Sequence, residues 1–416
     1  MTQRRVVIVG GGVIGVACAH YLTKTGAQVT VIDQGRIGGG CSHGNCGYVS
    51  PSHILPFAGP GAIGRTLKTL FQKNSPLKVR FRFDPALWGW FLRFARRCNA
   101  ADMLEAGHAI DALLRTSRAL YDDLLRETGF DVEFEARGII FVLRTAAGMH
   151  HYEEVDRLLA SEFNLPAKRL DGPALTEYEP ALVPGLAGGW LYECDAHLRC
   201  DRLLRVWRER LVSNNLSIRE QCEFRGVTTN GRMVSSVETA HGPIPTDVVV
   251  IATGAWTPLL HKQLGIRLPI QPGKGYSITM PRPAQCPTTP LIFEEHRVAI
   301  TPFRSGYRIG STMEFAGYDA TMSRDRFNLL RDGAALYLRE PSAEPVQEEW
   351  WGWRPMVPDG KPIIGRLPKF DNIWIAAGHG MLGLSMATGT GKLVSELIVG
   401  STPHVDPQPY RVERFS

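Results

Sequence analysis

One local arrangement near the amino terminus restricts the fold of this 416-residue chain more than any other feature. The β-branched run at residues 6–9 predicts a buried parallel strand, and Gly10-Gly11-Gly12-Val13-Ile14-Gly15 follows it directly. A helical pattern covers residues 13–24, and a second strand is expected at 28–32, ending at Asp33. Glycines at G-x-G-x-x-G spacing between a strand and a helix predict a dinucleotide-binding βαβ unit.

Each part of this unit has a mechanical role. Gly10 permits the tight turn, Gly12 lets the backbone approach a pyrophosphate, and Gly15 lets the helix pack on the strand. The helix N-terminus offers free N–H groups to the phosphates. Asp33 would accept hydrogen bonds from ribose hydroxyls and repel a 2′-phosphate. The expected cofactor contacts in this unit are therefore Gly10, Gly12, Val13, Ile14, Gly15 and Asp33.

A second glycine-rich loop, at residues 34–47, favours FAD over NAD. Plain NAD dehydrogenases usually continue here with a helix and a third strand, whereas a polar loop suits an extended cofactor whose flavin end must be wrapped. A further buried strand near 247–252 ends in a turn of small residues, which is typical of two-dinucleotide-type flavoproteins. The contacts with FAD expected from these two segments are Gln34, Ser42, Asn45, Gly47, Thr253 and Gly254.

The carboxyl-terminal part repeats the pattern of strand, glycine turn and helix. Residues 372–377 predict a strand and residues 384–398 a helix, whose N-terminus would stabilise negative charge on a reduced flavin. The alternative is an ordinary turn in the same sheet. His379 in this turn is a candidate base, or more simply a hydrogen-bonded loop histidine. The expected flavin contacts are Gly378, Gly380, Met381, Leu382 and Gly383.

Arg354 follows three tryptophans, at 350, 351 and 353. This pattern suggests an apolar wall around one fixed positive charge. A guanidinium can hold a carboxylate through two parallel hydrogen bonds, which is the chemistry needed to orient an amino or imino acid. A structural arginine that caps a turn is the alternative.

Composition excludes several other classes of protein. The net charge is only +6, and no zinc-finger, basic-zipper or recognition-helix pattern occurs, so we expect no nucleic-acid partner. None of the eight cysteines forms C-x-x-C, so we expect neither a redox dithiol nor a metal site. Neither a signal peptide nor an apolar stretch of about 20 residues is apparent, which predicts a cytoplasmic protein that begins at residue 1.

Residues 51–98 interleave aromatic and basic side chains, with Asp84 the only acid between 61 and 100. Such a stretch could lie on an anionic membrane surface, which would make the protein peripheral on the inner membrane. The alternative is a helix that packs its aromatic side chains inward and exposes a basic face to water.

These segments together resemble the FAD-dependent D-amino-acid oxidase superfamily over nearly the whole chain. The resemblance is carried by residues 10–15, 42–51, 274–279, 298–301, 354–360 and 378–380. Within the superfamily, the chain is most similar to the family of bacterial D-amino-acid dehydrogenase small subunits, including its D-hydroxyproline dehydrogenase-type members.

The resemblance implies site residues and a cofactor. It implies that Arg354 holds the substrate carboxylate and that Tyr276 lines the substrate pocket, which gives Arg354, Tyr276 and His379 as the candidate catalytic residues. His43 and Cys46 depart from the small apolar residues usual in this loop of the dehydrogenases. Sarcosine-oxidase relatives attach flavin to a cysteine, but no cysteine follows Cys286, so we expect non-covalent FAD.

The expected architecture is α/β. A discontinuous Rossmann-like FAD-binding domain would comprise residues 1–54, 196–262 and 355–416, and an inserted α+β substrate domain with an antiparallel sheet would comprise 55–195 and 263–354. Between residues 263 and 340, prolines punctuate what we expect to be short extended runs.

The expected reaction is dehydrogenation of a small D-amino or imino acid, of the D-proline, cis-4-hydroxy-D-proline or D-alanine type. A hydride would pass from Cα to flavin N5, and the electrons would pass to a quinone or a protein acceptor. Two alternatives stay open: an O₂-using amino-acid or sarcosine-type oxidase, and the flavin subunit of a multi-subunit amine dehydrogenase that needs partner subunits.

Overall fold

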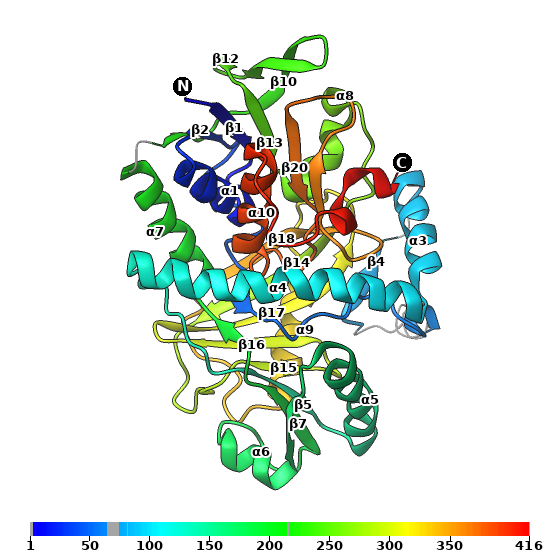
Figure 1. Ribbon diagram of the computed structural model, residues 1–416. Helices are drawn as coiled ribbons and strands as arrows, with labels where there is room; N and C mark the ends of the chain where they lie inside the picture. Colours follow the sequence, from blue (N-terminus) through cyan, green and yellow to red (C-terminus); the bar gives the residue numbers. More distant parts are fainter. Residues whose placement is uncertain (1–2, 65–74, 81, 214–215, 416) are drawn as a thin grey trace.

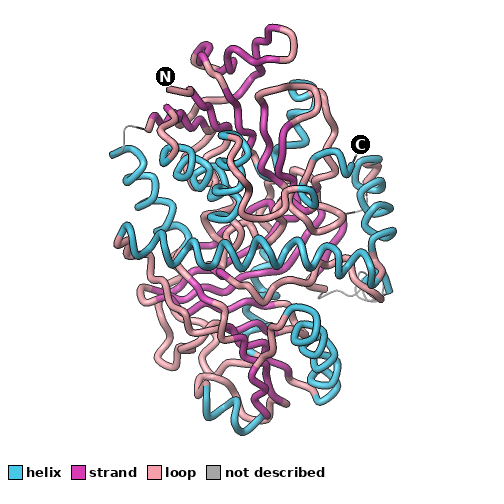
Figure 2. The backbone as a smooth tube through the Cα atoms, viewed as in Figure 1, coloured by secondary structure: helices cyan, strands magenta, loops and turns pink. Residues whose placement is uncertain are grey.

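Two β-sheets form the framework of the molecule in the computed structural model, which describes residues 3–64, 75–80, 82–213 and 216–415. Figure 1 shows one sheet above the long helix α4 (Ala100–Thr128) and most of the other sheet at the level of this helix or below it. Figure 2, in the same orientation, shows the two groups of strands separately. An α/β fold with a Rossmann-like part and a second, sheet-based part is confirmed.

The first sheet is mostly parallel. Its strands, in spatial order, are β19 (Ile363–Arg366), β20 (Ile373–Ala377), β13 (Val248–Ile251), β1 (Arg5–Val9), β2 (Gln28–Ile32) and β9 (Ser217–Arg219). All neighbouring pairs are parallel except β19 with β20. The strand β1 lies centrally and is buried at four of its five residues, which explains its continuous β-branched sequence.

Helices cover one face of this sheet, and a small sheet covers the other. The helices α1 (Val13–Lys24) and α10 (Ala387–Val399) share one hydrophobic core with α4 and with α7 (Cys200–Ser213). A separate core lies on the opposite face, against the antiparallel strands β10 (Phe224–Asn230), β11 (Met233–Thr239) and β12 (Gly242–Pro245).

The second sheet is mostly antiparallel. Its main path is β18 (Glu348–Met356), β14 (Gln271–Met280), β17 (Gly306–Phe315), β16 (Val298–Phe303), β15 (Leu291–Phe293), β5 (Ile139–Leu143), β7 (Gly188–Tyr192) and β6 (Lys168–Asp171). The short strand β4 (Leu77–Val79) pairs with β17, and β3 (Tyr48–Val49) pairs separately with β8 (Ala196–His197). The helices near this sheet are α3 (Pro85–Arg97), α5 (Ala146–Phe163), α6 (Gly172–Tyr178) and α9 (Arg324–Ala335).

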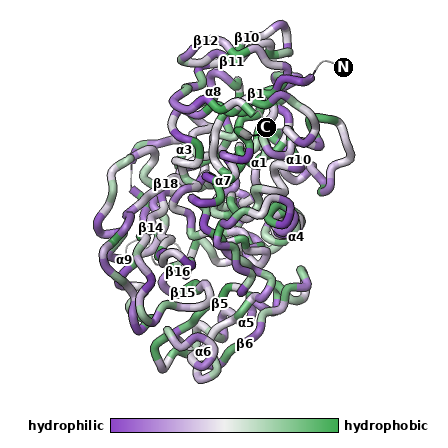
Figure 3. The backbone as a smooth tube through the Cα atoms, turned by 90° about the vertical axis from the view of Figure 1, so that its left-hand side faces the viewer, coloured by the Kyte–Doolittle hydropathy of each residue, from purple (hydrophilic) through white to green (hydrophobic). Residues whose placement is uncertain are grey.

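The helix α4 connects the two halves of the molecule. Asn99 caps its N-terminus by accepting a hydrogen bond from the Asp102 N–H, and Gly129 ends it in the left-handed conformation. Its apolar side packs on α10, where Ser117 Oγ lies 2.7 Å from Thr388 Oγ1. Figure 3 views this helix along its axis and shows hydrophobic and hydrophilic stretches around it. Although α4 lies within residues 55–195, its buried face therefore packs on the first sheet's helices.

Expected and observed elements differ in two places. The helix expected at 384–398 begins at Ala387, because the residues before it form successive turns. The segment 263–340 contains a helix that we did not expect, α9, whose Phe327 and Leu330 pack on the second sheet. The i, i+3 spacing of these two residues is the helical signal within that segment. The domain boundaries stay a proposal, since β18 continues across the expected boundary at 354/355.

The tight turn after β1 predicts which glycine substitutions are tolerated. A Cβ on Gly15 would lie 1.9 Å from the Gly10 carbonyl oxygen, so Gly15→Ala should lower the free energy of unfolding by about 1–3 kcal/mol. Gly226→Ala is the matched control, because no atom lies within 4 Å of the Cβ position there. Urea denaturation measures both, and equal unfolding free energies would contradict the close helix–strand contact.

Candidate active site

The turn after β1 has the geometry that a dinucleotide fingerprint requires. Gly10 has a positive φ of 108°, and a Cβ there would lie 2.5 Å from the Ala252 carbonyl oxygen. Its N–H donates to the Ile32 carbonyl at 2.8 Å, which fixes the turn to β2. The fingerprint glycines thus leave a backbone cradle between β1, β2 and β13 that any side chain would fill.

The carboxylate of Asp33 is held at the edge of this cradle. Its Oδ2 accepts from the Gly11 N–H and its Oδ1 accepts from the Gly35 N–H, both at 2.7 Å. Each carboxylate oxygen has a further lone pair, so Asp33 can still accept from a ribose hydroxyl. Gln34, which we also expected at the cofactor, has an exposed side chain.

Ser42 joins the cradle to the second glycine-rich loop. The N-cap residue of α1, Gly12, has no side chain to cap the helix, and the Val13 N–H donates instead to Ser42 Oγ at 3.1 Å. The segment 41–47, which we call the flavin-side loop, therefore starts at the N-terminus of α1. The expected contacts Gly12, Val13 and Ser42 are brought together here.

The other end of the flavin-side loop packs on the second sheet. The Cys46 carbonyl accepts from Thr301 Oγ1 at 2.6 Å, and Asn45 Oδ1 accepts from the Gly47 N–H at 2.7 Å. A Cβ on Gly47, whose φ is +84°, would lie 2.0 Å from the Leu198 carbonyl oxygen. The loop therefore spans from the dinucleotide helix to the sheet, which is the path that an extended cofactor would follow.

The sheet face that meets this loop is made of small residues. Cβ positions on Gly310 and Gly352 lie close to the loop, at 2.5 Å from Cys46 Sγ and 3.2 Å from Cys41 Cα respectively. Ser277 lies on the same face, where its Oγ is buried without a hydrogen-bond partner in the structure. The small residues thus allow the loop to pack closely on the sheet, and the unpaired Ser277 hydroxyl is a polar group that a bound ligand could satisfy.

Arg354 lies on this same face of β18. Its guanidinium covers Gly275, where a Cβ would lie 2.2 Å from Arg354 Cζ. Nη1 donates to the Thr312 carbonyl at 2.6 Å and Nη2 donates to the Ser311 carbonyl at 3.4 Å. Within the described part of the chain, no aspartate or glutamate forms an ion pair with it. Burial lowers the pKa of Arg354, so its positive charge lacks the anion that would compensate desolvation.

A strained bulge supplies the two carbonyls that hold Arg354. Ser311 and Thr312 have φ values of 116° and 54°, and the pairing of β14 with β17 shifts register beside them. A β-branched threonine is disfavoured at positive φ, so this conformation costs energy that the surrounding sheet must supply. Bulges re-aim groups near binding sites, and this one turns two carbonyl oxygens toward the guanidinium. The Thr312 hydroxyl is itself buried and unpaired.

The carboxyl-terminal glycine turn is attached to the strand that bears Arg354. The Gly380 N–H donates to the Pro355 carbonyl at 3.1 Å, and a Cβ on Gly378 would lie 2.5 Å from Val357 Cγ2. The side chain of Met381 packs beside Met356. The turn 378–383 therefore borders the Arg354 site, although α10 begins only at Ala387.

His379 is buried within this turn. Its Nε2 lies 3.0 Å from Thr390 Oγ1, and burial lowers the pKa of His379 to about 3. A histidine with such a pKa is neutral and is a weak base near pH 7. The geometry therefore favours the hydrogen-bonded loop histidine, and we assign His379 no catalytic role.

Tyr276 lies on the opposite face of the sheet from Arg354. Side chains alternate along β14, so Gly275 and Ser277 face the flavin-side loop while Tyr276 faces α9. Its hydroxyl donates to Glu314 Oε2 at 2.8 Å, and its ring packs edge-on against Phe327. Tyr276 therefore faces away from Arg354 and the flavin-side loop, whereas Ser277 faces toward them; that Tyr276 lines the substrate pocket stays a prediction.

The remaining expected contacts lie at the end of β13. Thr253 Oγ1 lies 2.9 Å from Thr257 Oγ1, and Gly254 begins the 3₁₀ helix η1 (Gly254–Leu260) with a φ of 52°. The neighbouring Ala252 carbonyl borders the Gly10 turn, as described above. Thr253 and Gly254 therefore follow directly after the strand that forms one wall of the cradle.

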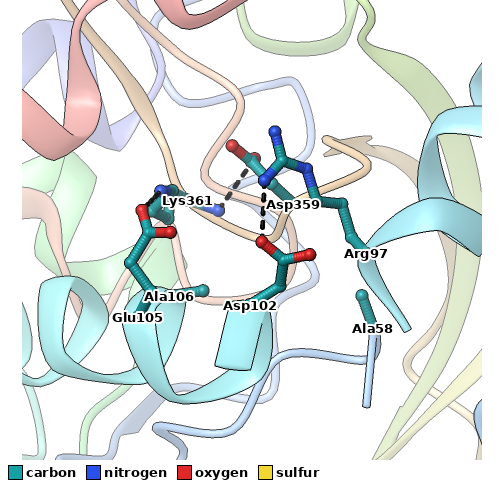
Figure 4. Close-up of a pocket in the computed structure, with 7 residues that line it drawn as sticks. All are labelled: Ala58, Arg97, Asp102, Glu105, Ala106, Asp359 and Lys361. Carbon is teal, nitrogen blue, oxygen red and sulfur yellow. Dashed lines mark hydrogen bonds and ion pairs between the residues drawn. The ribbon is translucent and has the colours of Figure 1, made fainter. Parts of the chain in front are cut away.

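A separate small pocket lies where α3 and α4 meet the turn after β18 (Figure 4). Arg97 and Lys361 each form an ion pair with an acid of α4, Asp102 at 2.8 Å and Glu105 at 2.6 Å. Asp359 accepts from Arg414 Nε at 2.8 Å. Because its charges are paired with one another, this cluster connects α3, α4 and the turn after β18. It differs in this respect from the site around Arg354.

The residues that the structure describes contain no group of three or more histidine, cysteine, aspartate or glutamate side chains arranged to hold a metal ion. None of their helices has the length and hydropathy needed to cross a bilayer.

Comparisons with known proteins agree with this geometry. Residues 5–397 match the family described as DAO, FAD dependent oxidoreductase. A D-amino acid dehydrogenase of Granulibacter bethesdensis is 34% identical to this chain, over 99% of this chain and 100% of its own length. A D-amino acid dehydrogenase of Paramagnetospirillum magneticum is 33% identical and covers 99% of each chain.

Solved structures show the same fold. Glycine oxidase from Geobacillus kaustophilus superposes with a TM-score of 0.79 at 23% identity, covering 99% of both chains. L-proline dehydrogenase from P. horikoshii superposes with a TM-score of 0.75 at 22% identity, covering 100% of this chain and 99% of its own. The match to a family of FAD-dependent oxidoreductases identifies the cofactor of this chain as FAD, and the glycine cradle with Asp33 at its edge fits a dinucleotide.

The position of Asp33 predicts its contribution to FAD affinity. In Asp33→Asn the amide nitrogen cannot accept from a backbone N–H, and the charge that strengthens a ribose hydrogen bond is lost. We expect the dissociation constant for FAD to rise about ten- to a hundredfold, since hydrogen bonds to charged groups contribute about 1.5–3 kcal/mol. Quenching of FAD fluorescence by the apoprotein measures this constant. Asp371→Asn, at an exposed ion pair with Arg232, is the control, and equal constants for the two variants would remove Asp33 from the site.

Proposed function

This chain belongs to the DAO family of FAD-dependent oxidoreductases, and we propose that it dehydrogenates small D-amino or D-imino acids. The observation that carries the proposal is the buried Arg354 guanidinium, which has no acidic partner among the residues that the structure describes and lies on the face that meets the flavin-side loop. A carboxylate is the group that such a guanidinium binds best, through two parallel hydrogen bonds. The full-length relatives called D-amino acid dehydrogenase support the D configuration and the dehydrogenase activity.

Bound FAD supplies an acceptor for a hydride from the substrate Cα. Arg354 binds the substrate carboxylate, and the carbonyls of Ser311 and Thr312 fix the direction of the guanidinium. The indole of Trp350 lies over Gly44 and Gly352 and excludes water from one side of the site. If the substrate amine enters neutral, its lone pair forms the imine as the Cα–H bond breaks, and no protein base is needed. Orientation by Arg354 then supplies most of the rate enhancement.

We propose that FAD is held non-covalently along the cradle, the flavin-side loop and the carboxyl-terminal turn. Gly10, Gly12, Gly15 and the N-terminus of α1 would contact the pyrophosphate, and Asp33 the ribose. The segments that would surround the flavin contain Ser42, Asn45, Gly47, Thr253, Gly254, Gly378, Gly380, Met381, Leu382 and Gly383.

The finer choice of substrate lies among D-proline, cis-4-hydroxy-D-proline and D-alanine types. Two other classes of function compete with the dehydrogenase: an oxidase that uses O₂, and a flavin subunit that needs partner subunits. No observation on this chain favours either over the dehydrogenase.

Anaerobic bleaching of the visible flavin spectrum tests the proposal. The panel consists of D-alanine, D-proline, cis-4-hydroxy-D-proline, their L-forms and sarcosine. We expect bleaching by at least one D-acid and slow re-oxidation by air, with fast re-oxidation by a soluble quinone. Bleaching by sarcosine or the L-forms alone would contradict the substrate class, and fast re-oxidation by air would identify an oxidase.

Arg354 variants test the assigned role in the same assay. Arg354→Gln should raise the KM about a hundredfold and leave FAD bound, because the charge-assisted bonds to the carboxylate are lost. Arg354→Lys should be intermediate, since an ammonium keeps the charge but lacks the planar fork. Arg324→Gln, at an exposed ion pair with Glu349, is the control. An unchanged KM in Arg354→Gln would remove Arg354 from the substrate site.

We further propose that the electrons pass to a quinone or a protein acceptor and that α3 attaches the protein to an anionic membrane surface. One side of α3 is buried, with Leu87 in the core and Trp90 Nε1 donating to the Met356 carbonyl at 3.1 Å. Trp88 and Leu92 are exposed, beside the exposed Arg93. The helix therefore packs some aromatic side chains inward and exposes basic side chains to water, as in the alternative considered above. It also exposes apolar side chains on its outer side. Such a surface suits the interface of a bilayer with anionic lipids.

Sedimentation with lipid vesicles tests this surface. We expect binding to phosphatidylglycerol vesicles, weaker binding to phosphatidylcholine, and release by salt. Trp88→Ser combined with Leu92→Ser should abolish the binding, whereas Leu259→Ser, at an exposed leucine of η1, should not. Equal binding by the double variant would exclude α3 as the attachment surface.

A further inference from the structure

A second buried arginine, Arg308 on β17, contacts the flavin-side loop. Its side chain is 1% exposed. Nη1 donates to the Asn45 carbonyl at 2.7 Å and to the His43 carbonyl at 3.3 Å. The loop thus receives hydrogen bonds from two side chains of the second sheet, because Thr301 Oγ1 also donates to the Cys46 carbonyl.

The other nitrogens of Arg308 are fixed from three directions. Nε donates to Thr279 Oγ1 at 2.9 Å, on the neighbouring strand β14. Nη2 lies 3.7 Å from Asp201 Oδ1 at the start of α7 and 3.9 Å from Glu348 Oε2 on β18. The guanidinium also lies over the Phe303 ring, 5.5 Å from its centroid. A planar cation with this many partners has one orientation, so the loop carbonyls that it holds are fixed as well.

Glu348 makes a second connection to the same loop. Its Oε1 lies 2.8 Å from His43 Nε2, so one carboxylate faces both Arg308 and the imidazole of the loop. The loop is therefore held to the sheet through the His43 side chain and through the carbonyls of His43, Asn45 and Cys46. Its other end is bonded through Ser42 to the N-terminus of α1.

We propose that Arg308 is a positioning residue that sets the distance between the flavin-side loop and Arg354. Both arginines extend from the second sheet, Arg354 toward the substrate site and Arg308 toward the loop backbone. With Arg308 in place, the loop has one position relative to the sheet strands that carry Gly310, Gly352 and Arg354. The inference rests on the proposed FAD site and does not depend on which amino acid is oxidised.

An arginine with a purely structural role would affect FAD binding differently from a positioning arginine. It would stabilise the apoprotein and leave the affinity for FAD and the optical activity of bound flavin unchanged. A positioning arginine changes both, because the loop that borders the flavin shifts. Lysine at this position keeps the charge and can still donate to one carbonyl, so it should restore part of the effect.

The His43–Glu348 pair adds a dependence on pH. The hydrogen bond to Glu348 is the main cause that raises the pKa of His43, and the same bond lowers the pKa of Glu348. The charged groups that face this pair are Asp201, Arg199 and Arg308. Because the pKa of His43 is raised, the His43–Glu348 pair stabilises the position of the loop below that pKa. This stabilisation is lost as the pH rises through the pKa of His43. The lowered pKa of Glu348 sets the lower limit of the pH range in which the pair stabilises the loop, because the stabilisation is lost as the pH falls through that pKa.

The test measures FAD binding to apoprotein variants by fluorescence quenching, together with the visible circular dichroism of the bound flavin. We expect Arg308→Gln to weaken FAD binding at least tenfold and to alter the flavin dichroism. Arg308→Lys should recover part of both changes. Arg304→Gln is the matched control, because Arg304 lies in the turn between β16 and β17 and pairs with the exposed Asp131. Its FAD affinity and spectrum should equal those of the wild type.

Two further variants keep the proposal testable if Arg308→Gln does not fold. Thr301→Val removes the hydroxyl that donates to the Cys46 carbonyl, and Glu348→Gln removes the charge opposite His43. Both should weaken FAD binding several-fold, and Glu348→Gln should flatten the loss of affinity with rising pH seen in the wild type. Wild-type affinity and dichroism in the folded Arg308→Gln, or in both of these variants, would overturn the positioning role. Failure of the wild-type apoprotein to bind FAD would instead overturn the proposed FAD site.

Discussion

The guanidinium of Arg354 is a positive charge removed from water, and no acid of the described residues pairs with it. The surrounding structure is arranged to tolerate that charge. The bulge at Ser311 and Thr312 turns two carbonyl dipoles toward it at the cost of positive φ values. Gly275 leaves the room in which the guanidinium lies. This arrangement is incomplete by itself, because carbonyl dipoles compensate a buried charge only in part. A bound carboxylate would complete it, which is the physical basis for proposing that this site takes anionic substrates.

Two buried arginines, Arg308 and Arg354, extend from the second sheet and have different partners. Arg308 donates from Nε and Nη1 to three protein oxygens, and two carboxylates lie within 4 Å of its Nη2. Arg354 donates to two backbone carbonyls and forms no ion pair with a carboxylate of the described residues. The contrast separates a group whose hydrogen bonds are satisfied in the folded chain from one that retains donors for a ligand. The flavin-side loop lies against both arginines, so the segment proposed to border the cofactor is fixed relative to the strands proposed to bind the substrate.

Local sequence patterns were sufficient for the first βαβ unit but not for the substrate side. The boundaries of α1 and β2 agree with expectation, because the glycine fingerprint, the apolar period and Asp33 all act within about 30 residues. The face on which Tyr276 lies could not be read from its motif, since it depends on which side of β14 meets the loop. No motif or spacing in the sequence indicated a role for Arg308. Its partners come from residues 43, 45, 201, 279 and 348, and only the folded sheet brings them together.

The order of strands in the first sheet has a consequence for synthesis on the ribosome. The central strand β1 emerges first, but its neighbour β13 follows some 240 residues later, and β20 completes the parallel core only near residue 377. The apolar faces of β1 and β2 therefore lack their partners during most of translation, and such unpaired strands are prone to aggregate. The apolar side of α4 is synthesised early but packs on α10, so it also lacks its partner until the end of translation. Loss of the last 50 residues would thus leave a first sheet without β20 and without the helix α10, which shares its core with α1.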